Sequence, residues 1–166
     1  GMEQAALALF GVTPAGHGLP VAPFRYLADS GRAPAGCCWC VDPVHLRADT
    51  HGLVLFDAAT CRLSEAERQA LFVSLRDFLS ETDWSLETSD SQNWYLHGLG
   101  PDQLHTALLS QVCGKPVSDY LPRGRAAAQW MQRSNEMQML LHSHPVNEQR
   151  AAGGLPAVNR VWISGG

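Results

Sequence analysis

The sequence predicts a single α+β domain, with antiparallel hairpins forming a mixed or antiparallel sheet and helices packed on it. Strand-like runs occur in pairs joined by turn residues, and helical patterns are grouped around these pairs. The chain has 166 residues, of which 45% are hydrophobic, enough for one buried core. Neither an internal repeat nor an interdomain linker divides the sequence, so residues 1–166 form one predicted domain.

Two short helices are predicted near the start of the chain. The first covers residues 3–10, an Ala/Leu-rich run that ends before Gly11 and Pro14. The second begins at Pro23, which suits the first turn of a helix, and ends near Gly31.

The strongest strand signals follow in residues 37–41, 44–48 and 53–56. Gly52 can adopt the positive φ that a tight hairpin between the last two runs requires. A helix is predicted next, because Ser64 and Glu67 have the spacing of a capping box. Its buried stripe consists of Leu71, Leu75, Phe78 and Leu79.

The second half of the chain repeats this mixture of hairpin and helices. A hairpin is expected between residues 84–87 and 93–96, and two short helical turns within 102–121. A long helix over about 125–141, a short helix over 146–152 and a final strand over 158–163 complete the expected elements.

Composition excludes several classes of function. The net charge is −4 and Lys115 is the one lysine, so a general phosphate-backbone binder is not expected and we predict no nucleic-acid partner. No apolar run reaches the ~18–20 residues that span a bilayer, and the start lacks a signal-peptide pattern. Five cysteines without a disulfide spacing suit a reducing compartment. We therefore expect a cytoplasmic protein without a membrane partner.

Both ends suggest a piece of a longer protein. Gly1 before Met2 resembles the residue left by a cleaved expression tag, and Gly165-Gly166 directly follow a strand-like run. We expect the C-terminus to be truncated.

Two stretches carry a resemblance to known proteins. The first is Asp42-Pro43-Val44-His45-Leu46-Arg47-Ala48-Asp49 with residues 52–57 and 63–67. The second is residues 135–147 with Arg150, residues 154–159 and Trp162. Together they resemble the RpfE-type regulatory proteins and, more distantly, archaeal-type cofactor-independent phosphoglycerate mutases, whose pattern is an Asp-Val-x-x-Arg-x-Asn strand and a later His-Pro-x-Asn-x-x-Arg run.

The resemblance implies a role for the chain. These mutases have an alkaline-phosphatase-like metal core interrupted by an inserted domain that covers the substrate, and the chain resembles that inserted domain with its exit strand. The resemblance implies a regulatory or ligand-binding domain that is not catalytic on its own, or alternatively the substrate-covering domain of an active metal-dependent mutase or phosphohydrolase. A divalent metal is expected in the parent protein and no cofactor in this chain. The expected partners are a small anionic metabolite and the rest of the parent chain.

The chain departs from the mutase pattern at two places. Asp49 stands where the pattern has asparagine, and Ala58-Ala59 stand where it continues with arginines. Both changes weaken the prediction of phosphoglycerate binding.

Five residues are candidate ligand-binding residues. Arg47 and Asp49 share one strand face with His45, either as an anion-binding stripe or as a solvated face. Arg150 could clamp a carboxylate or phosphate, oriented by Asn147 and Asn159. Alternatively, these three residues tie the last helix to the final strand through backbone hydrogen bonds.

No catalytic residue is assigned, because the sequence contains no nucleophile elbow, phosphate-binding loop or zinc-protease motif. Asp42 and His45 could form a carboxylate–imidazole pair or simply lie exposed. His142 and His144 are weak metal candidates. Alternatively, they cap and pack the C-terminus of a helix.

Two further groups of residues have open roles. The cluster of Cys37, Cys38 and Cys40 could bind zinc or act in redox chemistry, or could be small buried thiols. A third function, protein–protein interaction, would use an exposed aromatic patch formed by Trp94, Tyr95, Trp130 and Trp162.

Overall fold

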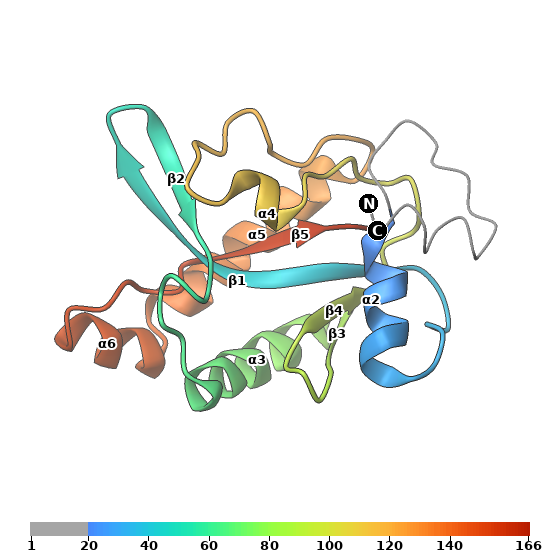
Figure 1. Cartoon of the computed structure of the whole chain (residues 1–166), viewed down its shortest axis with the longest axis horizontal. Helices are drawn as coiled ribbons and strands as arrows, with labels where there is room; N and C mark the ends of the chain where they lie inside the picture. Colours follow the sequence, from blue (N-terminus) through green and yellow to red (C-terminus); the bar gives the residue numbers. More distant parts are fainter. Residues whose placement is uncertain (1–19) are drawn as a thin grey trace.

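The computed structural model describes residues 20–166, so the helix predicted over residues 3–10 lies outside the described residues. Helices and strands are mixed along the chain around one sheet (Figure 1). In chain order the elements are α2 (Val21–Ser30), β1 (Cys38–Asp49), β2 (Gly52–Phe56), α3 (Glu65–Leu79), β3 (Ser85–Thr88), β4 (Trp94–His97), α4 (Leu109–Val112), α5 (Ala127–His142), α6 (Pro145–Ala152) and β5 (Arg160–Ser164).

The five strands form one antiparallel sheet with the long strand β1 at its centre. The strand order is β2-β1-β4-β3, and β5 pairs with β1. All four pairings are antiparallel, including β1 with β5, where Asp42 lies opposite Trp162. The predicted α+β class and both predicted hairpins are confirmed.

Strand β1 is continuous through Pro43, although the sequence predicted two separate strands there. Val44 accepts a backbone hydrogen bond from Asn159, so even-numbered residues of β1 direct their backbone groups toward the β5 side. Pro43 therefore faces the opposite edge, where pairing with β4 ends at Val41 and pairing with β2 begins at His45. The missing N–H of proline falls in the gap between two partner strands, so it removes no ladder hydrogen bond.

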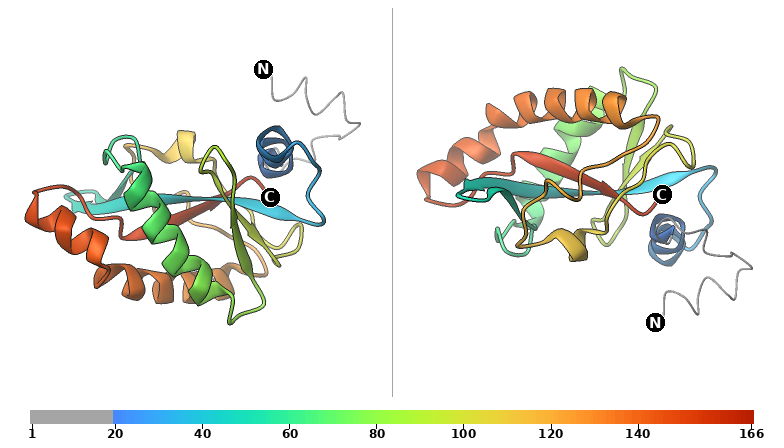
Figure 2. Two further views of the ribbon diagram at one scale, coloured as in Figure 1. Left: turned by 90° about the horizontal axis from the view of Figure 1, so that it is seen from below. Right: turned by 90° about the horizontal axis from the view of Figure 1, so that it is seen from above.

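One face of the sheet carries α3, α5 and α6, and the other carries α2 and α4 (Figure 2). Helix α3 begins with the predicted capping box, in which the Ser64 hydroxyl accepts from the Glu67 N–H and the Glu67 carboxylate accepts from the Ser64 N–H. Its buried residues Leu71, Leu75 and Leu79 join the main core beneath the sheet. On the other face, Ala22 and Tyr26 of α2 pack on Cys38, Cys40 and Tyr95.

The four aromatic residues predicted to form an exposed patch are all buried. Trp94, Tyr95, Trp130 and Trp162 belong to the hydrophobic clusters on the two faces of the sheet. The prediction of an interaction surface made of these side chains is therefore wrong. Within residues 20–166, none of the helices combines the length and the apolarity that crossing a membrane requires.

Candidate functional site

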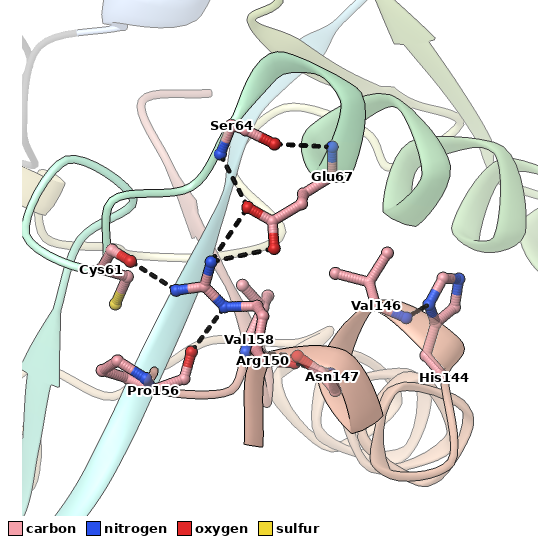
Figure 3. Close-up of polar contacts among 9 residues, drawn as sticks. All are labelled: Cys61, Ser64, Glu67, His144, Val146, Asn147, Arg150, Pro156 and Val158. Atoms are coloured by element: carbon pink, nitrogen blue, oxygen red, sulfur yellow. Dashed lines mark hydrogen bonds and ion pairs between the residues drawn. The ribbon is translucent and has the colours of Figure 1, made fainter. Parts of the chain in front are cut away.

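Arg150 lies on α6 and is buried in a set of internal contacts (Figure 3). Its Nε donates to the Pro156 carbonyl at 2.7 Å, and one terminal nitrogen lies 3.0 Å from both carboxylate oxygens of Glu67. The other terminal nitrogen donates to the Cys61 carbonyl. The guanidinium thus joins α6 to the start of α3 and to the loop that follows β2. All three of its nitrogens have protein partners.

The two predicted asparagines also bond to backbone groups. Asn147 donates to the carbonyls of Leu141 and Val158 and accepts from the Val158 N–H, each at 2.8 Å. Asn159 accepts from the Leu46 N–H at 2.8 Å and donates to the Leu46 carbonyl at 3.0 Å. Its side chain thereby bonds to β1 as the next residue of a strand would. These contacts fit the structural alternative for both residues.

The two histidine candidates lie at the junction between α5 and α6. His144 is buried at the N-terminus of α6, where its Nδ1 accepts from the Val146 N–H at 3.1 Å. Its Nε2 lies 2.9 Å from the Ser74 hydroxyl on α3. His142 is exposed at the end of α5. Among the residues that the structure describes, no group of three or more His, Cys, Asp or Glu side chains could hold a metal ion.

Arg47 and Asp49 lie at the exposed end of the β1–β2 hairpin. The Arg47 guanidinium carbon is 4.7 Å from the centre of the Phe56 ring, a cation–π contact. Asp49 accepts from the His51 N–H at 2.7 Å, which stabilises the turn of the hairpin. No carboxylate in the described part of the chain forms an ion pair with Arg47, so its guanidinium remains open to solvent.

The hairpin and the exit segment of α6 do pack together. His45 Nδ1 lies 2.7 Å from the Ala157 carbonyl, beside the contact between Asn159 and β1. Arg47 and Arg150, however, contact different residues and share no partner. Among the five predicted ligand residues, Arg47 and Asp49 are exposed on the hairpin, Asn147 and Arg150 are buried, and Asn159 is half-buried beside β1.

Asp42 and His45 do not form the carboxylate–imidazole pair considered from the sequence. Their positions three apart on β1 place them on opposite faces of the sheet. The carboxylate of Asp42 lies instead 3.7 Å from Arg25 on α2 and is only 10% exposed. Burial raises the pKa of Asp42, while the positive charges of Arg25 and Arg68 oppose that rise. The pair is therefore not formed, and the alternative that both residues simply lie exposed is wrong for Asp42, which is buried.

A network of polar side chains near Asp42 was missed by the sequence reasoning. Asp29 of α2 accepts from the Tyr95 hydroxyl, from Asn93 at 2.8 Å and from Ser89 at 3.2 Å. Arg25 donates to the Asn93 amide oxygen. Burial alone would raise the pKa of Asp29, but these hydrogen bonds lower it. The one signal of this network in the sequence was Asp42 itself, a charged residue inside an otherwise apolar run.

The cysteine cluster consists of thiols held in a low-dielectric setting. Cys38 and Cys40 are buried under α2, and Cys37 is half-buried. Burial raises the pKa of Cys38 to about 12 and that of Cys40 to about 11. Both groups therefore remain protonated at neutral pH, which argues against a reactive thiolate and fits the buried-thiol alternative.

A broad hollow with a volume of about 750 Å³ lies between the end of α2 and the end of the β3–β4 hairpin. Glu87 is its central polar group. Its carboxylate contacts the Tyr26 hydroxyl at 3.0 Å, Arg32 at 3.2 Å and His97 Nε2 at 2.8 Å. These groups satisfy one another and leave the hollow broad and open.

Comparison with known proteins finds similarity to one enzyme class. No protein-family profile matches the sequence. The chain is 41% identical over 54 residues to a 2,3-bisphosphoglycerate-independent phosphoglycerate mutase from Methanothrix thermoacetophila. That match covers 32% of this chain and 14% of the enzyme.

A solved structure shares the fold over most of the chain. It is a cofactor-independent phosphoglycerate mutase from Thermoplasma acidophilum, with a TM-score of 0.58 and 17% sequence identity. The match covers 85% of this chain and 40% of the mutase. The chain thus spans well under two thirds of the length of either mutase. It is distantly similar to one part of a cofactor-independent phosphoglycerate mutase.

Proposed function

We propose that the chain is a ligand-binding domain of a phosphoglycerate mutase-like protein, which covers a small phosphorylated acid and carries out no chemistry on its own. The observation that carries this proposal is the exposed Arg47 on a hairpin within a fold shared with part of a mutase. The catalytic groups and the divalent metal would belong to the rest of the parent protein, which is the main partner of this domain.

Arg47 is suited to this role by its surroundings. Its guanidinium is exposed and contacts the Phe56 ring, which orients the side chain without neutralising its charge. Arginine binds carboxylate and phosphate groups through paired hydrogen bonds. Arg150, by contrast, already uses its three nitrogens inside the protein. Within the proposal, Arg47 binds the anion, and Arg150 with Asn147 and Asn159 holds the hairpin and the exit segment in place.

Asp49 has a different part in the proposed site. It lies on the same strand face as Arg47, and one of its oxygens accepts from the His51 N–H. A carboxylate repels an anionic group, but it accepts a hydrogen bond from a ligand hydroxyl. A phosphorylated hydroxy acid offers both groups, which favours this class over a phosphorylated acid that has no hydroxyl.

A regulatory role is the second form of the proposal. It rests on the resemblance of residues 42–49 and 135–159 to RpfE-type proteins, in which the bound acid would act as a signal rather than as a substrate. Mutase activity of the parent protein separates the two forms. A substrate-covering domain requires that activity, and a purely regulatory domain does not.

Calorimetric titration with 3-phosphoglycerate tests the binding step. We expect Arg47→Met to weaken binding about tenfold or more, because a hydrogen bond to a charged group contributes about 1.5–3 kcal/mol. Arg125→Met is the matched control, since Arg125 is also exposed and has no ion pair in the described structure. Equal weakening by both variants would indicate nonspecific charge attraction. Absence of binding both in this chain and in the longer parent protein would refute the ligand-binding role.

A further inference from the structure

A second, mainly apolar groove runs beside β5, on the edge that does not pair with β1. It has a volume of about 290 Å³ and lies between α5 and the loop at residues 117–122. Figure 2 shows this long connection between α4 and α5 passing beside β5. Its apolar lining includes Leu46, Leu53, Leu121, Met131 and Trp162.

Three large apolar side chains that line the groove are exposed to solvent. Leu53 is 43% exposed, Leu121 is 40% exposed and Met131 is 36% exposed. In the described part of the chain, only Met139 and Leu155 are other large apolar residues that are this exposed. Convergence of three such side chains on one concave surface is typical of a binding site, whereas single exposed apolar residues are ordinary.

One cationic side chain lines the same groove. Arg160, the first residue of β5, donates from one terminal nitrogen to the Ser134 hydroxyl at 3.1 Å and to the Asn135 amide oxygen at 3.0 Å. Both partners are neutral. Across residues 20–166, no carboxylate lies within ion-pair distance of Arg160, whereas Arg150 and Arg25 have one at 3.0 Å and 3.7 Å.

Because Arg160 is half-buried, the lack of a neighbouring carboxylate among the described residues affects its charged state. Burial lowers the pKa of Arg160, and no neighbouring carboxylate compensates for its lost hydration. A guanidinium bonded by one nitrogen to neutral groups retains further donors for an incoming anion. The groove therefore combines an apolar wall with a cation that lacks an ionic partner.

We propose that this groove binds a small amphiphilic carboxylate, whose alkyl chain lies on Leu121, Met131 and Trp162 and whose carboxylate bonds to Arg160. The volume lies at the lower end of the range for small-molecule sites, which suits a short- to medium-chain acid. Charge complementarity selects an acid over a neutral lipid or alcohol. This site is independent of the proposed phospho-acid site, because Leu46 and Arg47 are adjacent on β1 and face opposite sides of the sheet.

Titration of the 166-residue chain with octanoate and with octanol tests the proposal. The two probes have the same alkyl length and differ in charge. We expect octanoate to bind about tenfold or more tightly than octanol, because of the charge-assisted hydrogen bond. Arg160→Met should reduce octanoate binding to the level of octanol, and Arg125→Met should leave it unchanged.

A second pair of variants keeps the test decisive if Arg160→Met fails to fold. Met131→Glu places a carboxylate in the groove and should abolish octanoate binding. Met139→Glu is its matched control, because Met139 lies on the same helix, is 75% exposed and does not line the groove. Equal affinity for both probes, or no octanoate binding, would overturn the proposal. So would a dimer in sedimentation that Met131→Glu dissociates without any octanoate binding, since the groove would then bind a second copy of the chain.

Discussion

The buried guanidinium of Arg150 joins α6 to α3 through Glu67 and to the loop after β2 through the Cys61 carbonyl. Its position after the His-Pro-x-Asn segment indicated a polar role, and two alternatives followed: a ligand clamp or a structural tie. The contacts that separate them involve Glu67, which is 83 positions away, and Cys61, which is 89 positions away. Such partners depend on the tertiary fold, so the sequence pattern alone could not identify them. A ligand-binding role for Arg150 stays a prediction.

Substituting Arg150 separates these alternatives experimentally. We expect Arg150→Met to lower the free energy of unfolding by about 3–5 kcal/mol, because it leaves Glu67 and two carbonyls without their buried partner. Urea unfolding followed by tryptophan fluorescence measures this change. Arg76→Met is the control, since the Arg76–Asp77 pair is exposed and should contribute about 0–1 kcal/mol. An unchanged urea midpoint together with lost 3-phosphoglycerate binding would instead identify Arg150 as a ligand residue.

At the scale of elements, local signals predicted most of the fold. The capping box at Ser64 and the paired strand runs depend on residues close in sequence, and both are present in the structure. The break expected at Pro43 was wrong because the cost of proline depends on which edge of the strand it faces. That edge is decided by β4 and β2, whose pairing with β1 is a long-range property. The polar network of α2 with Asp42 was missed for the same reason.

The end of the β3–β4 hairpin provides a test at the level of elements. Gly98 has φ +101°, and an added Cβ would overlap the Asp83 carbonyl oxygen. Gly52 has φ +117°, but an added Cβ would meet nothing within 4 Å. We expect Gly52→Ala to lower the free energy of unfolding by about 1 kcal/mol through backbone strain and Gly98→Ala to lower it by about 2–3 kcal/mol. Equal losses in urea unfolding would show that the approach of Asp83 does not constrain the hairpin.

At the scale of the whole molecule, the similarity to a mutase lies in the fold. The sheet and its helices share their arrangement with part of a mutase at 17% identity, a level at which side chains are free to diverge. The hollow around Glu87, the groove beside β5 and the exposed Arg47 therefore depend on side chains of this chain rather than on the shared fold. Charged side chains also link separate elements of the molecule, so its stability should depend on pH.

Stability should fall at acidic pH, because carboxylates join distant elements. Burial alone would raise the pKa of Glu67, but hydrogen bonds from Ser64 and the charge of Arg150 lower it. The pKa of Asp29 is likewise lowered. A group whose pKa is lower in the folded state stabilises the protein above its unfolded pKa, and that contribution is lost as pH falls through the folded pKa. Asp42 has a raised pKa and acts in the opposite direction, so it offsets part of the loss.

Urea unfolding at a series of pH values from about 6 to 2 measures this effect, since unperturbed carboxyl groups titrate near pH 4. We expect the free energy of unfolding to decrease over this range and to decrease less steeply in Glu67→Gln, which retains an amide for capping but cannot titrate. Glu65→Gln is the matched control, because Glu65 is an exposed carboxylate in the same helical turn. Parallel curves for wild type and Glu67→Gln would show that the link between α3 and α6 does not sense protons. A shallower curve confined to Glu67→Gln would assign the acid sensitivity to that ion pair, because both variants remove the same charge from the helix N-terminus and only one removes a partner of Arg150.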